Sequence, residues 1–105
     1  MRQSNGKATD TLMTVRNLLS ANRAELERLG VETLALFGSA ARGEERPDSD
    51  LDFVVRFTGT ATFARYMDLR FLLEELLGHP VDLVTWKGVR PEIRESVERE
   101  AVRVA

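Results

Sequence analysis

Two short groups of residues have the types and the spacing that phosphoryl chemistry requires. A turn of small residues, Gly38-Ser39, ends one apolar run, and ten residues later Asp50-Leu51-Asp52 begins another. Small residues leave backbone N–H groups open to phosphate oxygens. Side chains two positions apart on a strand lie on one face, about 6.5–7 Å from each other. The stretch therefore favours a site that holds a triphosphate and divalent metal ions.

A third carboxylate, Asp82, lies between Val81 and Leu83 in another predicted strand. Neighbouring strands are about 4.8 Å apart, so Asp82 reaches Asp50 and Asp52 if the two strands are adjacent. Converging carboxylates raise one another's pKa unless cations occupy the site, and Mg²⁺ prefers such oxygen ligands. Taken singly, an Asp-x-Asp pair, a Gly-Ser turn and a strand aspartate are each common without any function. Their combination in this order predicts a metal site.

The elements that must position these residues alternate between helical and strand patterns. Apolar residues at helical spacing mark the helices, and Gly30 and Gly78 end two of them. In the second strand the odd positions face the core, which leaves Asp50 and Asp52 together on the other face. In chain order, the expected elements are a helix over 11–29, a strand over 32–37, a helical turn over 39–43, a loop over 44–49, a strand over 50–57, a helix over 61–77, a strand over 80–85 and a helix from Pro91.

The connections between the strands predict the fold class. A helix joins the second and third strands, so these are expected to be parallel neighbours with a right-handed crossover. A loop with a single helical turn joins the first and second strands, which can therefore be antiparallel neighbours. The sequence thus predicts an α/β (α+β) fold, with a small mixed sheet of three or slightly more strands packed with about four helices. At 105 residues the chain forms one domain over 11–105, after a flexible N-terminal tail over 1–10.

The composition narrows the class of protein. With 43% hydrophobic and 30% charged residues the chain is globular, and without cysteine it is expected in the cytoplasm. The first ten residues do not form a secretory signal, and no apolar run approaches the roughly 20 residues that span a bilayer, so no membrane partner is expected. The net charge is -2, with 15 basic and 17 acidic residues. Without a basic excess, strong direct binding of nucleic acid is not expected.

The two groups of residues carry a resemblance to a known family. Gly38-Ser39, ten residues and then Asp50-Leu51-Asp52 resemble the signature of the DNA polymerase β-type nucleotidyltransferase superfamily. More narrowly, residues 37–43 and 49–53 resemble the minimal nucleotidyltransferases, which are the MntA-like antitoxin partners of HEPN-domain ribonucleases. Residues 80–84 resemble their third acidic strand. The resemblance covers about residues 12–102 and implies the polymerase β-type nucleotidyltransferase fold.

The resemblance also implies a role for each acid and for the turn. Asp50 and Asp52 would ligate two Mg²⁺ ions, and Asp82 would ligate the catalytic ion and help to deprotonate the attacking hydroxyl. Gly38 and Ser39 would hold the β- and γ-phosphates of ATP. An acceptor hydroxyl would attack the α-phosphate, and pyrophosphate would leave. Such chemistry depends mostly on positioning and charge neutralisation.

Other side chains near these segments have less specific assignments. Arg42, on the helical turn, either points back at the phosphates as a nucleotide-binding residue or lies at the surface. His79 is expected to be a loop residue without function. Tyr66 and Trp86 are expected in the core or on a partner-facing surface, with stacking on a base as an alternative for Trp86. Contact with a phosphate is an alternative for Lys87.

The function implied by the resemblance is that of an antitoxin protein adenylyltransferase. AMP would pass from ATP to a tyrosine hydroxyl of a cognate HEPN toxin, with which the chain would form a hetero-oligomer. One alternative is nucleotidyl transfer to a small molecule or to RNA. Another is a non-catalytic antitoxin that neutralises its toxin by binding. Three converging acids argue against the last alternative, since occlusion alone does not need them.

Overall fold

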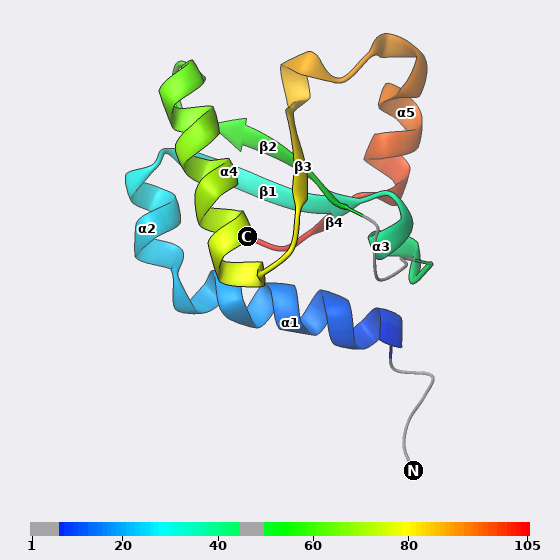
Figure 1. Cartoon of the computed structure of the whole chain (residues 1–105). Coiled ribbons are helices and arrows are strands. Elements are labelled where there is room, and N and C mark those ends of the chain that lie inside the picture. The colour runs from blue at the N-terminus through cyan, green and yellow to red at the C-terminus, as the bar shows by residue number, and fades with distance from the viewer. Residues whose placement is uncertain (1–6, 45–49) are drawn as a thin grey trace.

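The chain forms a four-stranded mixed sheet with helices packed on it (Figure 1), in a computed structural model that describes residues 7–44 and 50–105. The strand order is β3-β2-β1-β4. As predicted, β1 and β2 are antiparallel, whereas β2 and β3 are parallel and joined through a helix. The strands are β1 (Val31–Phe37), β2 (Leu51–Phe57), β3 (Val81–Thr85) and β4 (Val102–Arg103).

In the described part of the chain, five helices and one 3₁₀ turn connect and cover the strands. Most begin and end close to their predicted positions. Thr62 caps the fourth helix by accepting from the backbone N–H of Arg65 at 3.1 Å, and Gly78 ends it in the left-handed conformation. The helices are α1 (Lys7–Ala21), α2 (Arg23–Arg28), α3 (Ser39–Arg42), α4 (Phe63–Leu77) and α5 (Pro91–Glu100), and the 3₁₀ turn is Trp86–Gly88.

The prediction of one continuous helix over 11–29 is wrong. The segment forms α1 and α2, and α1 begins earlier than expected, at Lys7. The break falls at Asn22, whose backbone leaves helical geometry (φ -119°, ψ 28°) while its side-chain Nδ2 donates to the carbonyl of Leu18 at 2.8 Å. Asparagine side chains offer the backbone an alternative partner in this way, which interrupts helices.

The two faces of the sheet are covered unequally. One face packs against α1 and α4 and forms the main core, in which Leu19, Phe53 and Leu69 are fully buried. The other face carries a smaller cluster, where Val54 packs with Val89 and with Val97 of α5. In Figure 1, α5 lies at the opposite side of the sheet from α2 and α4. Asp52, two residues before Val54 on β2, lies on this second face of the sheet.

Two predicted segments fall partly outside the described residues: the tail over 1–10, of which 1–6 are not described, and the loop over 44–49, of which 45–49 are not described. Within residues 7–44 and 50–105, no helix combines the length and the apolar character that crossing a membrane requires. The two-residue strand β4, which sequence reasoning missed, pairs with Ala35 and Leu36 and places the last residues of the sequence beside β1.

Candidate active site

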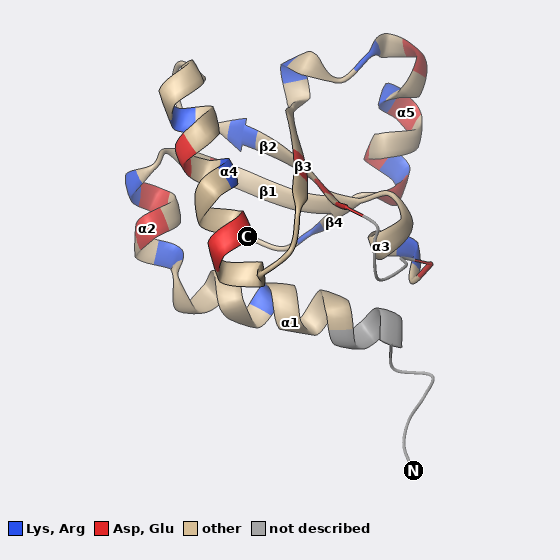
Figure 2. Ribbon diagram, viewed as in Figure 1, with Lys and Arg blue, Asp and Glu red and all other residues tan. Residues whose placement is uncertain are grey.

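Asp52 and Asp82 form the centre of the candidate site. They are the second residues of β2 and β3, and the parallel register places them directly opposite each other. Figure 2 shows acidic residues on these two strands near their amino-terminal ends. Burial of the Asp52 carboxyl, the neighbouring charges of Asp82 and Asp50, and a side-chain hydrogen bond with Asp82 raise the pKa of Asp52 to about 6. Two carboxyl groups held this close share a proton more readily than they share two negative charges.

Gly38 brings the phosphate-binding turn against the same carboxyl group. It follows β1 with φ 76° and ψ -154°, a region of backbone space that is open essentially only to glycine. A Cβ atom at this position would lie closer than 3.0 Å to Oδ2 of Asp52 and 3.2 Å from its Cγ. Position 38 therefore needs glycine for its backbone and also for the space that Asp52 occupies.

The single-turn helix α3 places Ser39 next to this contact. Ser39 is the first residue of α3, and its carbonyl accepts from the backbone N–H of Glu44 at 2.8 Å. Gly43 ends the turn in the left-handed conformation, and the N–H of Arg42 donates to the carbonyl of Gly38 at 3.3 Å. The segment is tightly wound, and the half-buried Ser39 lies beside the Gly38–Asp52 contact.

Arg42 is held between two carboxylates. Its Nε donates to Oε1 of Glu44 and its Nη1 donates to Oε1 of Glu100, both at 3.0 Å. These hydrogen bonds, with Glu44 first, and the two charges raise the pKa of Arg42, and its own charge lowers that of Asp52. The guanidinium thus lies within electrostatic reach of the acids. Sequence reasoning missed Glu100, because a residue 58 positions away gives no local signal.

The remaining predicted ligand, Asp50, lies outside the Asp52–Asp82 pair. It is exposed and directly precedes β2, and its charge contributes to the raised pKa of Asp52. In the described part of the chain, no three acidic, histidine or cysteine side chains are gathered closely enough to hold a metal ion. The donor set nevertheless fits a divalent cation, because the Asp52 carboxyl, whose pKa is raised, and the neighbouring Asp82 carboxyl offer the hard oxygen ligands that Mg²⁺ prefers.

The remaining residues singled out from the sequence lie in different places. Tyr66 packs against the main core, as predicted, and its hydroxyl donates to the carbonyl of Leu83 at 2.6 Å. His79 precedes β3 in a loop, with Nδ1 3.1 Å from the carbonyl of Pro80. Trp86 and Lys87 lie beyond the carboxyl end of β3, where the Arg56 guanidinium stands over the Trp86 ring. Arg56 is thus a neighbour of Trp86 that no sequence motif identified.

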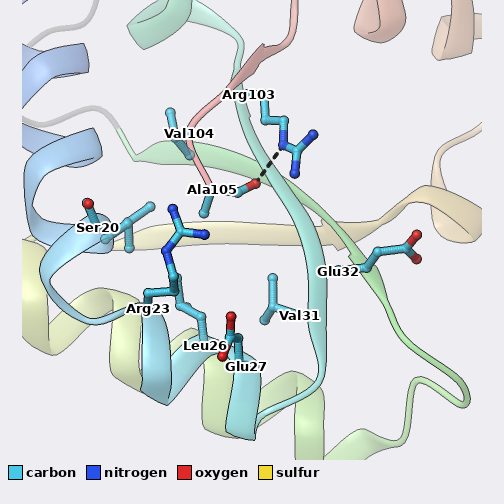
Figure 3. Close-up of a pocket in the computed structure, with 10 residues that line it drawn as sticks. Ser20, Arg23, Leu26, Glu27, Val31, Glu32, Arg103, Val104 and Ala105 are labelled. Carbon is cyan, nitrogen blue, oxygen red and sulfur yellow. Dashed lines mark hydrogen bonds between the residues drawn. The ribbon is translucent and has the colours of Figure 1, made fainter.

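A small pocket elsewhere on the molecule is unsuited to a nucleotide. It lies between α1, α2, β1 and the last residues of the sequence (Figure 3), where Nε of Arg103 donates to the carbonyl of Ala105 at 3.0 Å. Its volume is about 110 Å³, whereas small-molecule sites measure roughly 300–1,000 Å³. Asp50, Asp52 and Asp82 are not among the residues that line it.

Comparisons with known proteins agree on the family. The nucleotidyltransferase domain family matches residues 15–104. Protein adenylyltransferase MntA of Thermococcus cleftensis is 40% identical over 95 residues, which cover 90% of this chain and 96% of that protein. A solved structure described provisionally as a minimal nucleotidyltransferase is 43% identical, with a TM-score of 0.76 over 87% of this chain and 93% of that one.

More distant solved structures share the fold. A toxin–antitoxin complex with AMP-PNP is 22% identical, with a TM-score of 0.69 over 86% of this chain and 72% of that one. A tri-AMPylated HEPN toxin of Shewanella oneidensis in complex with its MNT antitoxin is 20% identical, with a TM-score of 0.55 over 82% and 71%. The predicted polymerase β-type nucleotidyltransferase fold is confirmed. By its sequence and its fold, this chain belongs to the nucleotidyltransferase domain family, as an enzyme of the MntA-like minimal nucleotidyltransferase group.

Proposed function

We propose that this chain is a cytoplasmic antitoxin that transfers AMP from ATP to a tyrosine hydroxyl of a cognate HEPN-domain ribonuclease. The single observation that carries the proposal is the Asp52–Asp82 carboxyl pair, of which Asp52 lies against Gly38. The packing of a small sheet does not require two neighbouring carboxyl groups, one of them half-buried, beside a glycine with this backbone conformation. The naming of a 40% identical relative as a protein adenylyltransferase supports the same activity.

The proposal assigns the acids to metal binding and proton transfer. Asp50, Asp52 and Asp82 would hold two Mg²⁺ ions, which when bound neutralise charge on the attacking and leaving oxygens. Asp82, exposed at the edge of the pair, takes up the proton of the acceptor hydroxyl. The acceptor oxygen forms a bond to the α-phosphorus, the bond from that phosphorus to the bridging oxygen breaks, and pyrophosphate leaves.

The proposal assigns Gly38, Ser39 and Arg42 to the triphosphate. Because Gly38 has no side chain, the Asp52 carboxyl lies directly against the turn. The β- and γ-phosphates would bind the backbone of Gly38 and Ser39 beside it. The Ser39 hydroxyl donates to the same phosphates. Arg42 exchanges its partners Glu44 and Glu100 for a phosphate oxygen, which is a charge-assisted contact of similar strength.

The proposed acceptor lies on a partner protein in a hetero-oligomer. Two structures that share this fold are complexes of an antitoxin with its toxin, and in one of them the toxin carries AMP. A tyrosine hydroxyl supplied by such a partner would complete the site.

Radiolabel transfer tests the proposal. The chain, α-labelled ATP, Mg²⁺ and the product of the neighbouring gene are incubated together, and the variant Asp52→Asn is compared with the wild type. Asp68→Asn is the matched control, since Asp68 is an exposed aspartate on α4, away from the acids. The proposal expects label on the partner with wild type and control but not with Asp52→Asn. If no label reaches the partner and all three proteins still suppress toxicity, neutralisation by binding replaces it. If label reaches only RNA or a small molecule, the proposal of a protein acceptor is wrong.

A further inference from the structure

A second groove lies at the far end of β2 and β3 from the acids. Its walls come from the end of β2, the segment that leads into α4 and the 3₁₀ turn after β3, and they include Arg56, Thr60, Trp86 and Lys87. Its volume of about 640 Å³ lies within the roughly 300–1,000 Å³ range of small-molecule sites. The groove is therefore large enough for a nucleotide.

The chemistry of this groove is cationic and aromatic. The guanidinium of Arg56 stands 5.6 Å from the centroid of the Trp86 ring, and both Arg56 and Lys87 are exposed. Among the described residues that line the groove none is acidic, although the chain has more acidic than basic residues. Stacked arginine and tryptophan beside a lysine favour a ligand that has a planar ring and a negative charge.

Hydrogen bonds hold both walls of the groove in place. On one wall, Nη1 of Arg65 donates to the carbonyls of Thr58 at 2.8 Å and Thr60 at 3.1 Å. On the other, Oγ1 of Thr85 accepts from the backbone N–H of Gly88 at 3.1 Å, which fixes the 3₁₀ turn that carries Trp86. Walls fixed before a ligand arrives reduce the entropy cost of binding.

The groove and the acids lie on the same side of the sheet. Asp52, Val54 and Arg56 lie on the same face of β2. Trp86 packs in the same cluster as Val54 and Val84. Asp52 and Arg56 are four residue steps apart along the strand, which corresponds to about 13 Å. An extended ligand could therefore reach from the groove to the acids.

We infer that this groove binds a nucleotide unit other than the ATP being consumed, with the base stacked on Trp86 and its phosphate paired with Arg56 and Lys87. A neutral base does not need the two cations Arg56 and Lys87, which favour a phosphate in this groove. The phosphates of ATP are already assigned to Gly38 and Ser39. The unit is an AMP that the acceptor already carries. This assignment of its source rests on the proposed function, whereas the binding chemistry does not.

Fluorescence of Trp86, the single tryptophan of the chain, reports on the groove directly. The full chain is titrated with the dinucleoside monophosphate adenylyl-adenosine, without Mg²⁺. We expect saturable quenching whose midpoint rises about tenfold or more in Arg56→Gln and in Lys87→Ala, as loss of a charge-assisted contact predicts. Arg99→Ala, which changes an exposed arginine of α5, is the control and keeps the wild-type midpoint. Absence of quenching, or quenching that neither groove variant weakens, would overturn the inference.

A second titration separates the two sources of the nucleotide. In saturating AMP-PNP, adenylyl-adenosine still quenches Trp86 if the groove serves the acceptor. If AMP-PNP removes the response and itself quenches Trp86 in an Arg56-dependent way, the groove holds the base of ATP and the inference fails. Both titrations need no turnover, so they succeed or fail independently of AMP transfer. Where transfer occurs, intact mass spectrometry of the acceptor should show a lower ratio of second to first AMP with Arg56→Gln.

Discussion

Oδ2 of Asp52 occupies the space in which any residue other than glycine at position 38 would place its Cβ atom. The turn after β1 and the start of β2 are thereby locked together at the point where a phosphate and a metal ion would meet. The contact between Gly38 and Asp52 therefore affects both the stability of the fold and the geometry of the candidate site. Variants at either position test both properties.

Gly38→Ala should destabilise the fold by about 2–4 kcal/mol, through backbone strain and displacement of the Asp52 carboxyl group. Gly59→Ala is the matched control, since Gly59 has nearly the same φ, 74° against 76°, but its Cβ would meet no atom within 4 Å. Urea unfolding of both variants measures the difference. Equal losses of stability would show that the contact with Asp52 carries no cost of its own.

Asp52→Asn should stabilise the metal-free protein at pH 8 and have less effect at pH 5. The pKa of Asp52 in the fold is raised to about 6, so the folded state binds the extra proton between about pH 4 and pH 6, and the wild type loses stability as pH rises through this window. After a discount for solvent screening at this half-buried group, the gain at pH 8 is about 1 kcal/mol. Urea midpoints at the two pH values measure it, with Asp68→Asn as the control. A difference that does not change with pH would contradict the raised pKa.

Mg²⁺ should stabilise the wild type at pH 8 but not at pH 5, because protons compete for the same carboxylates. At a free concentration tenfold above its Kd, the ion would add about 1.4 kcal/mol. Thermal unfolding with and without Mg²⁺ measures the effect, and Asp82→Asn should abolish it. Stabilisation that survives in this variant would place the ion elsewhere.

Glu100→Gln should lower KM for ATP about two- to fivefold with little change in kcat, because it frees Arg42 for the triphosphate. Arg42→Gln should raise KM instead. Stability should change by no more than about 0.5 kcal/mol, since the ion pair is largely exposed. Glu98→Gln, an exposed neighbour on α5, is the control. An unchanged KM in Glu100→Gln would show that Arg42 does not bind the nucleotide.

The sequence predicted the parts of the fold that depend on local pattern. The alternation in β2 and the glycines at positions 38 and 78 carry strong local signals, because pleat and positive φ act within a few residues. Helix α4 and the parallel β2–β3 pair follow from the same signals. The proximity of Asp52 and Asp82 was deduced from the crossover rule, and the register places them opposite each other.

What the sequence did not predict depends on tertiary contacts. Strand β4 has two residues and exists only because β1 offers an edge to pair with, so it has no pattern of its own. The break at Asn22 needs a side chain to return to the carbonyl of Leu18. The contact of Arg42 with Glu100 and the stacking of Arg56 on Trp86 join residues whose meeting no spacing rule encodes.

The paired register of β2 and β3 makes this site sensitive to any shift of either strand. The position of Asp52 is set by β1 on one side and β3 on the other, and the position of Asp82 by its partner across the ladder. A one-residue slip in either strand would turn its carboxylate to the opposite face of the sheet. An engineer who redesigns this site should therefore preserve the register of both strands before changing any side chain in it.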